Sequence, residues 1–410
     1  MPPYQAPAGA RFEALDAWRG VCACFVVLFH FHGYSPIYTS PLVRNSYLFV
    51  DFFFVLSGFV IAWNYSARLD SWQALKRFLI LRVGRVYPLH VFMLFCFVAY
   101  ETVKLASGAA RVAGAQPFTG GTDPVAVLTN LLLVQSLNIH DTLTWNGPSW
   151  SISTEWWTYV LFALVAVLVG VRNWMLLAVA IAAPLLLLQL SKTGMDVTYD
   201  WGLIRCVFGF ALGVACCRIY RGLPVPAQRK LLFGAPGGST RPAFMTLVEL
   251  IVVAAVVLFV SFAGKNNWSL LAPFVFSAAV LVFAGEGGAV SRLFRSRPLK
   301  WLGQLSYSIY LTHFLVVITV PVLLKRVFHI DLWTPFALAT GETVQLYGRD
   351  NAQGTLLYLL VLAATLAFSA FTYRWVETPG REWSRRWAGR PMPARAVEPA
   401  ASSGGQVPSP

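Results

Sequence analysis

The sequence predicts an all-α protein, a polytopic membrane helix bundle with about ten transmembrane helices. Hydrophobic residues make up 57% of the 410 residues and charged residues only 12%, whereas charged side chains are about a quarter of a typical soluble domain. Apolar stretches recur along almost the whole chain, each long enough to cross a hydrocarbon core of roughly 30 Å. Because lipid offers the backbone no hydrogen-bond partners, we expect these stretches to be helical.

The expected spans follow one another with short connections. In order, they cover residues 17–34, 46–64, 78–100, 149–170, 173–190, 202–219, 244–263, 269–284, 301–324 and 355–376. The first span shows no small-residue cleavage site and is interpreted as a permanent helix rather than a signal peptide. Residues 126–138 are also apolar but too few to cross the core, so they predict a short re-entrant or interfacial helix.

The distribution of charge predicts the orientation of these spans. A net charge of +14 would suggest nucleic acid as a partner of a soluble protein, but here Lys and Arg lie mainly in short loops. Ten spans with both termini cytoplasmic place most of the 32 Lys and Arg residues on the cytoplasmic side, as the positive-inside rule requires. An extra span at 126–138 would place the basic loops that follow it on the outer side, against the positive-inside rule. No nucleic-acid partner is therefore expected.

Three regions follow from the same patterns. Residues 1–11 predict a disordered N-terminus, residues 12–380 an integral-membrane domain, and residues 381–410 a basic cytoplasmic tail rich in Pro, Ala, Gly and Ser. The six cysteines lack metal-ligand spacing, and no metal site is expected. The lipid bilayer is an obligatory partner, and the oligomeric state is left open.

The first polar cluster opens the first span. Asp16 and Arg19 lie at its start, and His30 follows eleven residues after Arg19, which in a helix is about 16 Å deeper. This arrangement joins a cationic anchor to a group that can accept a proton near neutral pH. Alternatively, His30 is an ordinary interfacial residue, as we expect for His32.

The second cluster is a pair of arginines in the third span. Arg82 and Arg85 are three residues apart and share one helix face, where, with Arg77, they could bind phosphates through their planar guanidinium groups. A positive-inside flank is the alternative. It explains Arg77 well, but Arg82 and Arg85 less well because they lie further into the apolar stretch.

The third cluster surrounds a Gly-Pro turn. Glu155 lies about a turn and a half inside the following helix, and Ser151 precedes it without the GxSxG pattern of a nucleophile. Trp145, Trp150 and Trp156 flank the carboxylate and would suit stacking on a sugar, although tryptophans are also the usual aromatic belt of a membrane interface. Ionisable groups within a span are costly, which makes Glu155 a candidate functional residue.

The fourth cluster lies near the C-terminal end of the membrane region. Ser306, Tyr310 and His313 are spaced by four and three residues and share one helix face, with Tyr307 beside them. Glu377 follows at the inner end of the last span. An interhelical hydrogen-bond seam with a purely structural role is the alternative.

Taken together, these residues resemble the acyltransferase 3 family of membrane acyltransferases, which includes bacterial O-acetyltransferases of surface polysaccharides. Residues 12–380 show the family's motifs in order, and no departure is found at these positions. The matching segments are Arg19-x10-His30, VDFFFVLSGFVI at 50–61, Arg82-x-x-Arg85, GPSWSISTEWW at 147–157, LSYSIYLTHF at 305–314 and VETPGR at 376–381.

The resemblance implies that acyl-CoA, with an acetyl group in the simplest case, approaches from the cytoplasm as a co-substrate. The acyl group then passes to a hydroxyl of a carbohydrate or glycolipid acceptor near the outer side of a bacterial inner membrane. No permanently bound cofactor is implied. Arg19, Arg82 and Arg85 would bind the donor phosphates.

In that scheme His30, Glu155 and His313 are the expected catalytic residues. His30 would act as general base or, as an open alternative, as a transient acyl carrier. Glu155 would orient an imidazole or the acceptor, and Tyr310 and His313 would donate to the developing oxyanion. Asp16, Ser151, Ser306, Tyr307 and Glu377 are expected to support the site.

Two other classes of function fit some of the same residues. Buried His, Glu and Arg could relay protons in a secondary transporter, but the inverted repeats and broken spans of such proteins are not evident. A non-catalytic sensor or assembly component on the same fold is the third possibility.

Overall fold

A computed structural model describes residues 12–107, 116–222, 241–327, 329, 332–337 and 343–389. Residues 1–11, which were expected to be disordered, and the part of the expected tail from residue 390 lie outside the described residues. Within them, nine helices are long and apolar enough to cross a membrane, judged by length and composition. The prediction of a polytopic helical bundle is confirmed.

The longer helices coincide with the expected spans. They are α1 (Glu13–His30), α4 (Phe49–Tyr65), α5 (Trp72–Ala106), α8 (Trp150–Leu168), α9 (Asn173–Leu190), α10 (Gly202–Gly222), α12 (Arg241–Ala263), α13 (Ala272–Ala284), α15 (Arg297–Val327) and α16 (Asn351–Thr372). Of these, α1 is not among the nine, because Glu13, Asp16 and Arg19 fall within its 18 residues. Ten expected spans thus correspond to nine strongly apolar helices and one more polar helix.

Shorter elements connect them. These are α2 (Pro36–Thr39), α3 (Pro41–Arg44), η1 (Ser46–Leu48), η2 (Gly120–Thr122), α7 (Val125–Leu131), η3 (Gly147–Ser149), η4 (Asn267–Leu271), α14 (Ala289–Phe294), β1 (Trp333–Ala337) and β2 (Thr343–Tyr347). The seven residues of α7 rise only about 10 Å, which confirms that 126–138 holds a short helix rather than a span.

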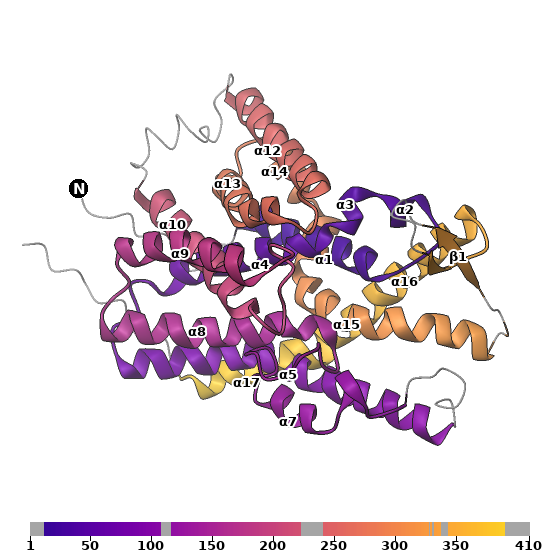
Figure 1. Cartoon of the computed structure of the whole chain (residues 1–410). Coiled ribbons are helices and arrows are strands. Elements are labelled where there is room, and N and C mark those ends of the chain that lie inside the picture. The colour runs from indigo at the N-terminus through magenta and orange to yellow at the C-terminus, as the bar shows by residue number, and fades with distance from the viewer. Residues whose placement is uncertain are drawn as a thin grey trace, which may run out of the picture.

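The two ends of the bundle differ. The antiparallel hairpin β1–β2 lies with α2 at the right-hand end in Figure 1, and we call this the hairpin end. Tyr347 of β2 accepts a hydrogen bond from the backbone of Tyr34 (2.8 Å), which ties the hairpin to the segment after α1. The opposite end carries α17 (Thr378–Trp387), which follows α16 through a π-helical turn at Tyr373–Glu377. We call it the basic end.

Helix α17 extends past residue 380, where the membrane domain was expected to give way to a tail. The segment TPGREWSRRW forms an amphipathic helix that packs along α5. Its small residues make this contact possible, since a Cβ on Gly380 would lie 2.5 Å from Cγ of Pro88. The expected tail therefore begins with a packed helix.

Helix α1 is held chiefly by α15, which lies almost 300 residues later in the chain. The two backbones touch at glycines: a Cβ on Gly20 would lie 2.5 Å from the carbonyl carbon of Leu302. At the start of α1, the Glu286 carboxylate accepts a hydrogen bond from Ala14 N–H (2.8 Å), an orphan donor of the first turn. Burial raises the pKa of the Glu286 carboxyl.

Helices α4 and α10 are joined by a buried ion pair. Arg205 Nε donates to Asp51 Oδ1 (2.9 Å) and Arg205 Nη2 to Asp51 Oδ2 (2.7 Å), and both side chains are almost completely buried. Arg205 also donates to the carbonyl oxygens of Tyr47 and Val197. With its donors satisfied, this pair serves packing and lies outside the expected site.

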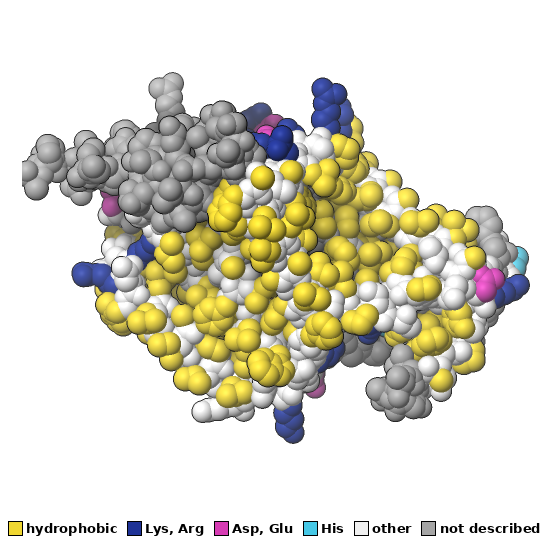
Figure 2. All heavy atoms as spheres, turned by 90° about the horizontal axis from the view of Figure 1, so that it is seen from above, with side chains coloured by type: hydrophobic (Ala, Val, Ile, Leu, Met, Phe, Trp, Pro, Cys, Tyr) yellow, Lys and Arg dark blue, Asp and Glu magenta, His cyan; other side chains and the backbone are white. Residues whose placement is uncertain are grey.

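The surface agrees with a lipid environment. Figure 2 shows hydrophobic side chains spread across the middle of the face seen from above, with Lys and Arg mainly at its rim. Large exposed side chains such as Leu177, Ile181 and Leu185 on α9 belong to this apolar surface. A soluble monomer rarely exposes so much contiguous apolar area, so the chain is an integral membrane protein.

Candidate active site

A cavity of about 950 Å³ opens within the bundle, and we call it the central cavity. Its walls come from α1, α4, α5, α8, α15, α17 and the π-helical turn. Its volume is at the upper end of the range for small-molecule sites. Residues expected from the sequence that line it are Asp16, Arg19, Arg82, Arg85, Ser151, Glu155, Ser306, Tyr307 and Tyr310.

Arg19 is oriented by α15. Its Nε donates to Ser306 Oγ (2.6 Å) and its Nη2 to Gly303 O (3.2 Å), while Asp16 pairs with it at 3.3 Å. About a quarter of the Arg19 side chain remains exposed. The close approach of α1 to α15 thus fixes the direction of this guanidinium into the cavity.

Arg85 is held by a carboxylate at the π-helical turn. Its Nη1 donates to Glu377 Oε1 (2.7 Å), and its guanidinium lies 5.4 Å from the centre of the Tyr307 ring. Glu377 is buried and also accepts from Ser308 (2.8 Å) and from Arg381. Glu377 therefore lies behind the cavity wall and positions Arg85.

Arg82 is different because no carboxylate pairs with it in the described part of the chain. It donates to Tyr65 Oη (3.3 Å), and its guanidinium lies within 6 Å of the rings of Tyr65, Phe78 and Tyr159. Its Nε has no hydrogen-bond partner among the described residues. Of the three expected phosphate-binding arginines, only Arg82 has no carboxylate partner among the described residues.

Glu155 is held by hydroxyl groups. Its Oε1 accepts from Ser57 Oγ (2.7 Å) and from Tyr159 Oη (2.5 Å). No hydrogen bond joins it to an imidazole among the described residues. Glu155 therefore does not contact a histidine that it was expected to orient. It does line the cavity, where it can contact a substrate.

His30 and His313 lie side by side at the interface of α1 and α15. His313 Nε2 is 3.1 Å from His30 Nδ1, and the ring centres are 4.8 Å apart. His313 Nδ1 is 2.7 Å from Tyr310 O, and His30 Nδ1 is 2.9 Å from Val26 O. Both carbonyls can only accept, so each neutral ring carries its proton on Nδ1.

This proton assignment decides what the pair can do. His313 Nε2 is unprotonated and accepts from His30 Nδ1, so it cannot donate to an oxyanion in this tautomer. The lone pair on His30 Nε2 then remains, and no partner for this nitrogen is found within the described ranges. His30 Nε2 is the basic atom of the pair.

Tyr310 connects the pair to the central cavity. Its ring centre is 6.0 Å from that of His313, and the residue itself lines the cavity, whereas the two histidines do not. Its hydroxyl donates to Pro148 O (3.1 Å) and accepts from Ser151 (2.9 Å). The hydroxyl proton is thus already used, which removes Tyr310 from the oxyanion role in this arrangement.

The three tryptophans expected to form an acceptor pocket do not line the central cavity. Trp145 packs against Phe118, and Trp150 lies under the Arg205 guanidinium at 5.3 Å. Trp156 packs against the apolar core as a half-buried residue. Aromatic residues that fill a core and aromatic residues that bind a sugar look alike in the sequence.

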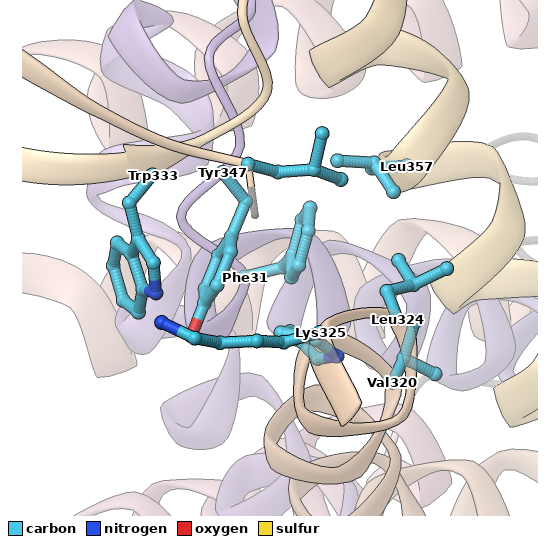
Figure 3. Close-up of a pocket in the computed structure, with 9 residues that line it drawn as sticks. Phe31, Val320, Leu324, Lys325, Trp333, Tyr347 and Leu357 are labelled. Atoms are coloured by element: carbon cyan, nitrogen blue, oxygen red, sulfur yellow. The ribbon is translucent and has the colours of Figure 1, made fainter. Parts of the chain in front are cut away.

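A second recess lies at the hairpin end beside Phe31. Figure 3 shows Trp333, Tyr347 and Phe31 side by side there, with Lys325 next to them. Its volume of about 10 Å³ has room for roughly one water molecule, so it holds neither a sugar nor a nucleotide. Elsewhere in the described ranges, no cluster of three His, Cys, Asp or Glu side chains is suited to hold a metal ion.

Several residues of the site were missed from the sequence. Ser57 and Tyr159 bind Glu155, and Arg381 and Arg385 line the cavity from α17. Tyr159 could have been found, because it follows Glu155 by four residues on the same helix face. Ser57 and Arg381 lie within the matching segments 50–61 and 376–381 but were not singled out, and Arg385 had the composition of a charged flank.

Comparison with known proteins identifies the family. Residues 12–376 match the family described as acyltransferase domain. The chain belongs to this acyltransferase family. Membership favours the interpretation as an enzyme over that as a transporter or a sensor.

Two relatives of this acyltransferase span most of its length, and a third spans about a third of it. It is 27% identical to acyltransferase MdmB of Streptomyces mycarofaciens, over 96% of this chain and 97% of that protein. It is 23% identical to the peptidoglycan O-acetyltransferase OatA of Listeria monocytogenes, over 90% of this chain but only 56% of that protein. Protein 2 in the picA locus of Rhizobium radiobacter is 33% identical over 35% of this chain and 77% of that protein. No solved structure matches.

Proposed function

We propose that this acyltransferase moves an acetyl group from cytoplasmic acetyl-CoA to a hydroxyl of a carbohydrate or glycolipid acceptor, with His30 as general base. The proposal is carried by the histidine pair, in which Val26 O and His313 Nε2 both accept from His30 Nδ1, so that His30 Nε2 stays basic. A cavity lined with arginines at its other end adjoins the pair through Tyr310.

The orientation follows from charge. The basic end, with α17 and the arginines of the cavity, would face the cytoplasm under the positive-inside rule, and the hairpin end would face outward. Both termini would then be cytoplasmic, in the inner membrane of a bacterium. Acetyl-CoA is made in the cytoplasm, so the donor would enter the cavity between Arg19, Arg82 and Arg85.

The donor would lie along the cavity with its phosphates at the basic end. Arg82 is the principal anchor in this proposal because its guanidinium lacks a carboxylate partner within the described residues. Arg19 and Arg85 already pair with Asp16 and Glu377, so part of their positive charge is balanced before the donor binds. The acyl thioester would extend past Tyr310 towards the histidines.

The transfer itself needs one base. His30 Nε2 removes the proton from the acceptor hydroxyl while the hydroxyl oxygen attacks the thioester carbonyl. When the tetrahedral intermediate collapses, the carbon–sulfur bond breaks, and the CoA sulfur leaves with the proton that His30 has taken up. The products are the acetyl ester of the acceptor and free CoA, and His30 returns to its starting state.

The test uses membranes that contain the protein, labelled acetyl-CoA and extracted envelope glycans. Wild-type membranes should label a glycan or glycolipid fraction, and His30→Ala should lower this labelling by about 100-fold or more, the scale of a lost general base. His32→Ala is the matched control, because His32 is an exposed histidine two residues away. Equal labelling by the His30→Ala variant would contradict the assignment.

A further inference from the structure

Helix α17 forms part of the wall of the central cavity. Arg381, Ser384 and Arg385 all line the cavity, and Ser384 is buried where α17 meets Gly84 of α5. Any side chain at Gly84 would collide with Ser384, so the register between the two helices is fixed. This register places residue 385 at the wall of the cavity.

The arginines near α17 differ in how far they are already engaged. Arg77 Nη1 donates to the carbonyl oxygens of Ala388 and Gly389, each at 2.5 Å, which closes the end of α17 onto α5. Arg381 pairs with Glu377. Arg385 is exposed and makes neither a hydrogen bond nor an ion pair with the described part of the chain.

The charge of the cavity calls for an anion. Six arginines line it, namely Arg19, Arg77, Arg82, Arg85, Arg381 and Arg385, and they face only two lining carboxylates, Asp16 and Glu155. Like charges gathered around one space repel one another, and a bound polyanion relieves that repulsion. Arginine suits phosphate in particular because its planar guanidinium can donate two parallel hydrogen bonds.

We infer that Arg385 binds a phosphate of the nucleotide end of the CoA donor, which makes α17 a wall of the donor site. This inference rests on the proposed use of acyl-CoA. Arg381 and Arg77 hold α17 in place, and Arg385 supplies the free guanidinium. The contact would also select for the donor, since a pantetheine thioester without the nucleotide has no phosphate for Arg385 to bind.

The experiment compares two neighbouring residues and two donors. Arg385→Gln and Arg386→Gln remove adjacent charges from the same helix, but only Arg385 lines the cavity. We expect Arg385→Gln to weaken binding of CoA to the purified protein, and to raise KM for acetyl-CoA, by about five- to tenfold, the effect of one solvent-screened arginine–phosphate contact. Transfer from S-acetylpantetheine should be unchanged in both variants.

The outcomes separate this inference from the proposed function. If the wild-type protein binds no CoA, the donor assignment fails, and the inference about Arg385 is overturned with it. If the wild-type protein binds CoA and Arg385→Gln binds it equally well, the inference about Arg385 is overturned and the donor assignment stands. Equal losses with acetyl-CoA and S-acetylpantetheine, or equal effects of Arg385→Gln and Arg386→Gln, would also overturn it.

Discussion

The hydrogen bonds of His30 and His313 use different ring nitrogens. His313 Nδ1 is held by Tyr310 O at 2.7 Å, so its Nε2 can only accept while the ring is neutral. His30 donates from Nδ1, which orients its ring and leaves Nε2 for chemistry. His313 is therefore a positioning residue in this arrangement, and its contribution should be separable from that of the base.

His313 should contribute to the rate through its hydrogen bond to His30. Replacement by Ala removes one of the two acceptors for His30 Nδ1 and leaves Val26 O at 2.9 Å. We expect kcat to fall about tenfold from the loss of one hydrogen bond, with KM for acetyl-CoA unchanged. His313→Gln can place an amide oxygen near the former Nε2 and should recover part of the rate. Steady-state kinetics on both variants check this. A rise in KM with unchanged kcat would mean that His313 acts in donor binding instead.

At the scale of elements, the geometry of the site depends on how closely α1 approaches α15. Gly20 on α1 lies against the backbone of Leu302 and Gly303, and this contact brings Arg19 within 2.6 Å of Ser306. The same pair of helices carries His30 and His313. A change in their spacing would therefore disturb both the arginine and the histidines.

Substitution of Gly20 tests this dependence. Gly20→Val puts a branched side chain where even a Cβ lies 2.5 Å from the Leu302 carbonyl carbon. We expect a loss of about 1–3 kcal/mol in the free energy of unfolding, which is the usual cost of overpacking, together with loss of transfer activity. Gly222→Ala is the control, since nothing lies within 4 Å of a Cβ there. Thermal unfolding in detergent and glycan labelling measure both effects, and an unchanged Gly20→Val protein would contradict the argument.

The long helices could be predicted from the sequence, but two shorter elements could not. The spans were predicted well, because a long apolar run in lipid has few alternatives to a helix. The hairpin at 333–347 and helix α17 were not predicted. Their stability comes from contacts with distant segments, such as Tyr34 for the hairpin and α5 for α17, and no local pattern records such contacts.

The candidate site could be predicted only in part, because many of its contacts join different helices. Residues that lie on one helix face, such as Ser306 and Tyr310, were grouped correctly by their spacing. The partners of Glu155 and the burial of Trp150 depend on which helices pack together, which spacing along one helix does not reveal. Helix spacing and the family motif both joined His30 to Arg19, but neither indicated the role of His313 as acceptor.

At the scale of the whole molecule, the proposal needs the two ends of the bundle to face different compartments. Thr39 in α2 is exposed at the hairpin end, and Glu382 in α17 is exposed at the basic end. In intact cells, a membrane-impermeant thiol reagent should label Thr39→Cys directly, and should label Glu382→Cys only after the membrane is permeabilised.

The wild-type protein is the control for this labelling. Its native cysteines are buried or half-buried, so they should give little background. Labelling of Glu382→Cys in intact cells would reverse the orientation and place the arginine-lined mouth outside. Acetyl-CoA would then be on the wrong side of the membrane for the cavity, and the proposed donor would have to be abandoned.

The pairing of α1 with α15 also has a consequence for biosynthesis. Helix α1 carries three charged residues, so its apolar residues alone stabilise it only weakly in the membrane. Its main packing partner, α15, begins only at Arg297. At translation rates of about 5–20 residues per second, α15 emerges roughly 15–60 s after α1. During that interval α1 can rest only on neighbours such as α4, and the half of the site that it carries stays unassembled. The histidine pair therefore forms late, when the last part of the bundle closes over the first.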